Sequence, residues 1–360
     1  MSQNPYRSLP DYNFWRNLAA TPYDEVDLCI GSKFLISQTD KVSTAGSCFA
    51  QHIAKRLAAS GYTYYITESA HRLVPEDLAL ENNYGVFSAR YGNIYSVAQL
   101  LQLFQRSYNI FMPKDDIWID KNKKFRDPFR PAVEYSGFSS LSEYYKDRER
   151  HFYAVRKMFE TTDIFVFTLG LTECWASKED GAVYPICPGV IGGSFDERIH
   201  QFENHTVERM MSNMEDFISL LKNVNSKCRI ILTVSPVPLA ATYENRHVLV
   251  STTYSKSALR VLAEQISIKY EHVEYFPSYE IITGNFNRGK YYAKDLRNVL
   301  DSGVDHVMRV FFKNFTQGDI YAPNDTEQKS NKVENSVDIA EKIASAICEE
   351  SVLGNAVNNI

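Results

Sequence analysis

The sequence lacks the features that mark membrane-spanning, secreted and fibrous proteins. No stretch approaches the roughly 18 consecutive apolar residues that a membrane-spanning helix needs. The opening residues, MSQNPYRSLPDYNFW, have no basic start followed by an apolar core, so no secretory signal is predicted. Only 16 glycines and 13 prolines occur in 360 residues, which excludes collagen-like and linker-dominated chains.

Basic runs and paired cysteines are also missing. The longest basic run is KNKK at 121–124, and 39 Lys and Arg stand against 44 Asp and Glu. A nucleic-acid-binding protein normally carries a basic stripe, so we expect no nucleic-acid partner. No two of the six cysteines lie within four residues, unlike the spacing of common zinc and redox motifs. We expect a cytoplasmic protein without a metal or another cofactor.

The composition is otherwise that of a globular protein with many aromatic side chains. Hydrophobic residues make up 44% and charged residues 23%, and the chain has 23 Tyr, 21 Phe and 3 Trp. Such aromatic content suits a groove for sugars or other flat substrates, although a tyrosine-rich core is the commoner explanation.

Short apolar runs alternate with helical patterns along the chain. The runs predict strands at 41–45, 62–67, 163–169, 229–234 and 272–276. Apolar residues at helical spacing predict helices at 49–60, 206–224, 255–269 and 303–315. This alternation predicts an α/β fold, a three-layer α/β/α sandwich with a central parallel sheet.

Two regions interrupt the alternation and are predicted to be insertions. Residues 70–160 contain helical patterns near 96–107 and 141–160, and residues 176–204 are predicted to form an ordered loop. We expect one domain over 1–322, followed by a tail over 323–360 with one amphipathic helix at 337–349.

The first strand ends in Gly46-Ser47-Cys48 and leads directly into a helix. In parallel α/β sheets, ligands bind at the carboxyl ends of the strands. A thiol or hydroxyl at a helix start is a candidate nucleophile, because the free N–H groups there lower a thiol pKa and stabilise an oxyanion. Alternatively, Ser47 only caps the helix and Cys48 only fills space.

The third strand ends in Gly170-Leu171-Thr172-Glu173. A glutamate between a buried strand and Trp175 is an unusual position for a charge, so Glu173 is a candidate substrate-binding residue. A helix-capping carboxylate is the alternative interpretation.

Several segments together resemble the GSCFA-domain family. They are TAGSCFAQHIAKRL, FSARYGNIYSVAQLLQL, FTLGLTECW, TVSPVPL, YSKSALR and YFPSYEI. The family resembles a branch of the SGNH/GDSL hydrolases, which include esterases, lipases and enzymes that add or remove carbohydrate O-acetyl groups. The resemblance implies an SGNH-like, flavodoxin-like domain.

The resemblance also implies roles for individual residues. Laid on the Gly-Asp-Ser block of the superfamily, Cys48 matches the nucleophile, and Ser47 competes for that role. Gly92 matches the glycine that helps to form the oxyanion hole, and Asn93 could add a donor. Thr172 replaces the asparagine of the third block and can still donate one hydrogen bond.

The last block, Asp-x-x-His, is incomplete. Asp295 matches the acid, but Asn298 stands where the histidine is expected. His306 lies eight residues further on, and on a helix it would lie near the same face two turns later. His306 is therefore the candidate replacement for the missing base, and a plain surface or packing histidine is the other interpretation. His247 is the alternative base.

These residues favour an esterase or O-acyltransferase that uses the Gly-Ser-Cys turn on an acyl ester, with a carbohydrate as the favoured acyl carrier. The alternative is a catalytically impaired, SGNH-like protein that binds a glycan or serves as a scaffold in polysaccharide biosynthesis. The expected partner is a small-molecule or carbohydrate acyl substrate, and the sequence does not indicate an oligomeric state.

Overall fold

A computed structural model describes residues 4–47 and 49–318 of the chain. Its centre is a parallel sheet in the order β1-β4-β8-β9. The strands are β1 (Val42–Gly46), β4 (Ile164–Leu169), β8 (Arg229–Val234) and β9 (Val273–Tyr275). β4 is buried along its whole length, because helices cover both faces of the sheet. The predicted three-layer α/β/α fold is confirmed.

Alternate residues of the strands point into two cores. Phe165 and Phe167 face a core made with four helices: α4 (Val97–Ser107), α5 (Leu141–Thr161), α6 (Val207–Val224) and α7 (Val248–Lys269). Ile164 and Val166 face a second core made with α2 (Phe49–Ala59), α8 (Ser278–Thr283) and α9 (Asp301–Phe315). Helix α7 begins seven residues before the predicted start at 255.

The strand predicted at 62–67 is wrong. This segment lies beside β1 at the edge of the sheet and forms a single bridge there, between Tyr64 and Val42. It then turns away, and Thr67 donates its backbone N–H to Ser88 at 2.7 Å. The residues of this segment favour strands, but here they pack against their neighbours and do not form a ladder of hydrogen bonds.

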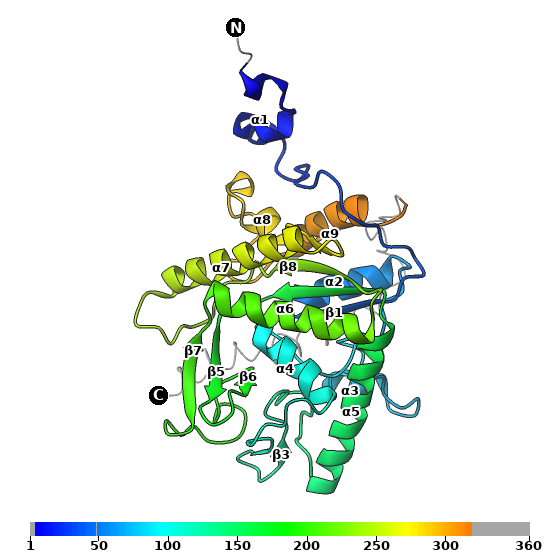
Figure 1. Cartoon of the computed structure of the whole chain (residues 1–360), viewed down its shortest axis with the longest axis vertical. Helices are drawn as coiled ribbons and strands as arrows, with labels where there is room; N and C mark the ends of the chain where they lie inside the picture. Colours follow the sequence, from blue (N-terminus) through cyan, green and yellow to red (C-terminus); the bar gives the residue numbers. More distant parts are fainter. Residues whose placement is uncertain (1–3, 48, 319–360) are drawn as a thin grey trace.

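The loop predicted over 176–204 is also wrong in part, because a small antiparallel sheet occupies this region. Its order is β6-β5-β7, and its strands are β5 (Glu173–Ser177), β6 (Val183–Tyr184) and β7 (His200–Asn204). In Figure 1 this sheet lies on the side toward which the arrowheads of the central strands point. It therefore continues the chain directly from the carboxyl end of β4.

The predicted insertion at 70–160 is anchored by buried charges. It includes α3 (Glu76–Glu81), the hairpin of β2 (Trp118–Ile119) and β3 (Phe125–Arg126), and helices α4 and α5. Arg130, 2% exposed, binds Asp127 at 2.8 Å and Asp147 at 2.7 Å. These pairs tie the loop before α5 to that helix.

The N-terminal arm lies apart from the sheet at the top of Figure 1. The arm contains α1 (Trp15–Ala20) and two short 3-10 turns, η1 (Pro5–Ser8) and η2 (Asp11–Asn13). A further 3-10 turn, η3 (Asn285–Asn287), lies elsewhere in the chain and follows α8. In the described ranges, no helix combines the length and the apolar character that crossing a membrane requires. The helix predicted at 337–349 lies outside the described residues.

Candidate functional site

The candidate site lies at the carboxyl edge of the central sheet, where β1 ends at Gly46. Gly46 has a φ of +142°, and a Cβ there would meet Thr168 Cβ at 2.7 Å. Only glycine fits this close approach of β1 to β4. Ser47 follows directly, and its carbonyl accepts the N–H of Ala50 at 2.9 Å in the first turn of α2. Cys48, the predicted nucleophile, lies outside the described residues.

The segment at 93–95 bridges the ends of β1 and β4. Ile94 donates its N–H to the Gly46 carbonyl at 2.9 Å. The Tyr95 carbonyl accepts the N–H groups of Gly170 at 3.0 Å and of Leu171 at 2.9 Å. The turn after β1, the segment carrying Asn93 and the residues after β4 therefore meet at one place.

Three buried polar side chains from these segments lack hydrogen-bond partners among the described residues. They are Ser47 Oγ, Asn93 Oδ1 and Thr172 Oγ1. The exposed fractions of the three residues are 4%, 6% and 0%. A buried hydroxyl or amide without a partner costs roughly 1–3 kcal/mol of folding free energy. Polar atoms that gather at this cost are typical of a site that a ligand completes.

Gly92 lies next to this cluster and has a φ of +71°, a conformation that favours glycine. The contribution of its N–H to an oxyanion hole stays a prediction. From the opposite side, α7 supports the cluster through two side chains. Ser255 Oγ accepts the N–H of Thr172 at 3.1 Å, and the buried Lys256 Nζ donates to the Gly170 carbonyl at 2.8 Å.

The structure does not bring Asp295 and His306 together. The exposed Asp295 accepts the N–H groups of Arg297 and Asn298, both at 3.0 Å, within its own turn. His306 is 1% exposed, with Nδ1 2.6 Å from Tyr291 Oη and Nε2 2.7 Å from the Val26 carbonyl. Burial lowers the pKa of His306. Both ring nitrogens are engaged, so this histidine stabilises the packing of α9.

The turn that carries Asp295 and Asn298 still lies near the carboxyl edge of the sheet. Arg297 Nε donates to the Pro238 carbonyl at 3.2 Å, in the loop that follows β8. The alternative base, His247, is exposed and caps α7, because its Nδ1 accepts the N–H of Leu249 at 3.1 Å.

Sequence reasoning missed an imidazole beside Thr172. His205 donates its backbone N–H to the Thr172 carbonyl at 2.9 Å, which continues the register that pairs Cys174 with Glu203. Their side chains therefore share one face of the small sheet. His205 is 1% exposed; its Nε2 lies 3.1 Å from Glu203 Oε2, and its buried Nδ1 has no partner in the described chain. The sequence does contain a signal for this histidine. Gln201, Glu203 and His205 are polar residues at every second position, which is typical of one face of a β-strand.

Cys174, Glu203 and His205 are also the one described group whose atoms could hold a metal ion, since they lie within 4.8 Å of one another. Cys174 Sγ lies 3.4 Å from His205 Nε2. Two observations favour hydrogen bonding over a metal. Arg209 binds the same Glu203 oxygen at 2.8 Å. Metal-bound histidines normally donate their second ring nitrogen to an acceptor, and within 4–47 and 49–318 no acceptor holds the second nitrogen of His205.

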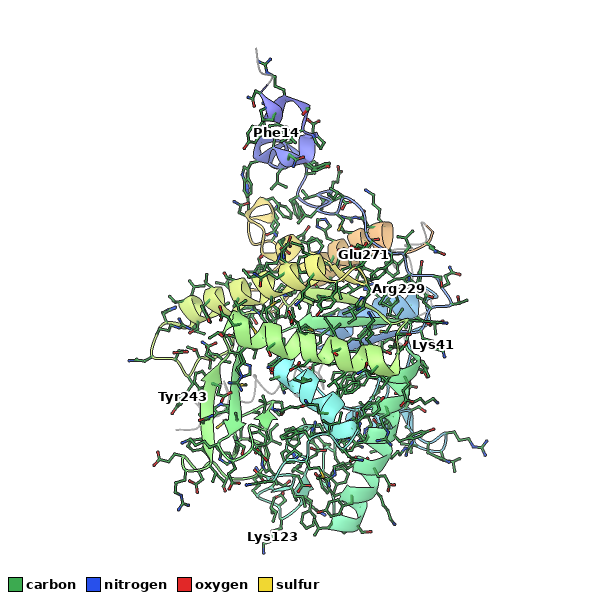
Figure 2. All side chains as sticks on the ribbon, in the orientation of Figure 1. Phe14, Lys41, Lys123, Arg229, Tyr243 and Glu271 are labelled. Atoms are coloured by element: carbon green, nitrogen blue, oxygen red, sulfur yellow. The ribbon has the colours of Figure 1, made fainter. Side chains whose placement is uncertain are left out.

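The opposite face of the small sheet forms an aromatic groove of about 550 Å³. Trp175 contacts Phe195, Phe202 and Tyr243, with ring centroids 4.9 to 5.8 Å apart. Figure 2 places Tyr243 at the end of the molecule opposite Arg229 and Lys41, which begin or precede β8 and β1. The groove therefore lies at the carboxyl side of the central sheet.

Glu173 lines this groove and is half-buried. Its carboxylate accepts from Thr242 Oγ1 at 2.7 Å and from the N–H of Tyr243 at 3.4 Å. Burial raises the pKa of Glu173. Because Glu173 follows Thr172 and points to the other face of the strand, the groove and the Thr172 side chain lie on opposite faces of the small sheet.

Comparison with known protein families matches residues 41–311 to the GSCFA family. A comparison with curated proteins finds no match.

Proposed function

The chain belongs to the GSCFA family, and from the geometry of its sheet edge we propose that it is an esterase or O-acyltransferase related to the SGNH/GDSL hydrolases. The observation that carries this proposal is the cluster of Ser47 Oγ, Asn93 Oδ1 and Thr172 Oγ1, all buried and unpartnered in the described structure. A tetrahedral acyl intermediate needs a nucleophile, a role open to Ser47 Oγ, and hydrogen-bond donors, of which the Thr172 hydroxyl is one. Asn93 Oδ1 can only accept, for example from a hydroxyl of the substrate.

In the proposed reaction, Cys48 Sγ or Ser47 Oγ attacks the acyl carbon of an ester. The carbonyl oxygen becomes an oxyanion, which accepts hydrogen bonds from the Thr172 hydroxyl, the Gly92 N–H and the Nδ2–H of Asn93. Collapse of the intermediate breaks the bond to the alcohol, which leaves with a proton. The acyl group then passes to water in hydrolysis, or to a second hydroxyl in transfer.

His205 is our candidate for the base that takes the nucleophile's proton and returns it to the leaving alcohol. Glu203 holds one ring nitrogen at 3.1 Å and leaves the other without a partner in the described chain. A carboxylate that orients an imidazole in this way recurs in enzymes with activated nucleophiles. We therefore propose Glu203, on β7, and His205, which directly follows β7, for the roles first expected of Asp295 and His306.

The aromatic groove supports a carbohydrate as the acyl carrier. Apolar C–H faces of a sugar stack on aromatic rings, while a carboxylate such as Glu173 accepts hydrogen bonds from its hydroxyls. The groove begins at Leu171, one residue after Gly170. A sugar bound there would contact Leu171 and Glu173, the two residues that flank Thr172 in the chain, and its O-acyl group would have to pass the start of β5 to reach the Thr172 hydroxyl.

The test is turnover of chromogenic acetyl and butyryl esters by the wild type, Cys48→Ala, Ser47→Ala and His205→Asn. We expect the nucleophile variant and His205→Asn to lose at least 100-fold in kcat/KM, the usual scale for a base. Equal rates in the wild type, Cys48→Ala and Ser47→Ala would contradict the proposal.

A second candidate function is glycan binding without catalysis. It is favoured by Asn298 at the position of the family's histidine and by the engaged ring nitrogens of His306. In that case wild-type protein binds an oligosaccharide in the aromatic groove, Trp175→Ala removes binding, and no ester is turned over.

A further inference from the structure

A second cavity lies away from the candidate site, between the end of α4 and helix α5. Its volume is about 420 Å³. Helix α4 starts beside the Asn93 segment and spans 11 residues, so its two ends are roughly 16 Å apart. The cavity is therefore separate from the acyl site proposed above.

Arg106, in the last turn of α4, lines this cavity and is 8% exposed. Its guanidinium carbon lies 3.8 Å from the ring centre of Phe129 and 5.7 Å from that of Phe152, and both rings also line the cavity. The buried Nε has no hydrogen-bond partner among the described residues. Burial lowers the pKa of Arg106 to about 10.

Nearby carboxylates are committed to other groups or lie at the surface. Asp127 acts on Arg106 at a distance, but its oxygens accept from Arg130 Nε at 2.8 Å and the Phe129 N–H at 3.0 Å. Asp116 pairs with Arg148 at 2.5 Å. Glu149 lines the cavity but is exposed at its mouth.

A guanidinium offers five donors, and arginine is rarely buried without a partner that accepts from them. Two further guanidinium groups, of Arg148 and Arg156, line the same cavity. Beside Glu149, the mouth carries two apolar or aromatic side chains, since Met112 is 77% and Tyr145 43% exposed. The space therefore combines a buried guanidinium, whose Nε has no hydrogen-bond partner among the described residues, with aromatic walls.

We propose that this cavity is a binding site for an organic oxyanion, a phosphate or carboxylate group on an apolar or aromatic body. The oxyanion accepts from the Arg106 guanidinium, with Arg156 as the second cation, and the body packs on Phe152 and Tyr145. Bidentate pairing of a planar guanidinium with such a group is the strongest hydrogen bonding an arginine makes.

Calorimetric titration of the full chain with phenyl phosphate, benzoate, inorganic phosphate and phenol tests this site. We expect phenyl phosphate or benzoate to bind more tightly than inorganic phosphate, phenol not to bind, and affinity to fall with added salt. The relative affinities of phenyl phosphate and benzoate identify the preferred oxyanion.

Arg106→Met should weaken binding at least tenfold while leaving the thermal midpoint of the ligand-free protein unchanged or raised, since it removes an unpartnered buried charge. Arg72→Met, an exposed arginine outside the cavity, is the matched control and should bind as the wild type does. If Arg106→Met does not fold, Arg156→Gln should still weaken binding severalfold.

Absence of binding by the wild type at millimolar probe overturns the proposal. It is also overturned if Arg106→Met binds as tightly as the wild type. A wild type that binds no probe, together with a strongly destabilised Arg106→Met, would show that the arginine acts only as packing between two rings.

Discussion

Replacing Thr172 by valine should stabilise the protein while it damages catalysis. Thr172 is completely buried, and its hydroxyl has no partner in the described structure. Burying a hydroxyl in this state costs roughly 1–3 kcal/mol, and valine has nearly the same shape without the polar atom. We therefore expect Thr172→Val to raise the free energy of unfolding by about 1–2 kcal/mol.

Thr233, near the end of the neighbouring strand β8, provides the matched control. It is equally buried, but its hydroxyl donates to the Phe276 carbonyl at 2.8 Å and contacts Ser278 Oγ at 2.5 Å. Thr233→Val removes these bonds and leaves Ser278 with a lost partner, so it should lower the free energy of unfolding by about 1–3 kcal/mol.

Urea denaturation of both variants measures the difference, with ester turnover assayed in parallel. Loss of one oxyanion donor lowers kcat by about 100-fold or more. The expected pattern is thus a more stable, less active Thr172→Val and a less stable Thr233→Val. If Thr172→Val is destabilised as much as Thr233→Val, the hydroxyl has a structural partner and the reasoning from an unpaired group is refuted.

Three further variants extend the account. Gly46→Ala combines a positive φ with a steric overlap and should cost about 3 kcal/mol or more in thermal or urea unfolding; an unchanged midpoint would contradict the close approach of β1 and β4. Arg130→Met removes the ion-pair partner of the buried Asp127 and leaves Asp147 with Arg90 alone, at 2.8 Å, so it should cost about 3–5 kcal/mol at pH 7. Burial alone would raise the pKa of the Asp127 and Asp147 carboxyl groups, but Arg130 lowers both pKa values on balance. The stability that these ionised groups contribute is present above the ordinary carboxyl pKa and is lost as the pH falls. The stability deficit of Arg130→Met should therefore shrink below about pH 4. His205→Asn should lower kcat/KM for ester turnover at least 100-fold while ester binding is kept, and an unchanged rate would assign the base elsewhere.

The central fold could be predicted because its signals are local. Apolar runs such as 163–169 and 229–234 are long enough to identify strands buried on both faces, and the helical stripes around them identify their covering helices. The strand expected at 62–67 has the same local signal, but it lies at the sheet edge, where its neighbours and not its composition decide the pairing.

The site could be predicted only where it follows a strand. The Gly46-Ser47 turn and Thr172 lie directly after β1 and β4, so parallel-sheet geometry brings them together. His205 could not be found in this way. It reaches Thr172 because β7 pairs with β5, and the residues of β7 lie in the region 176–204, for which the sequence predicts a loop. His306, eight residues after Asn298, does lie on a helix as expected, but its side chain is on the buried face of α9 and not at the candidate site.

Intact-protein and peptide mass spectrometry during ester turnover is the most direct test of the acyl chemistry proposed for the first strand end. The account predicts that brief exposure to a chromogenic acyl ester adds one acyl group to the wild-type chain, on the peptide containing Ser47 and Cys48. Because His205 is proposed to assist removal of the acyl group, the acylated peptide should persist longer in His205→Asn than in the wild type. An unmodified peptide during measurable turnover, or an adduct on another part of the chain, would contradict the account.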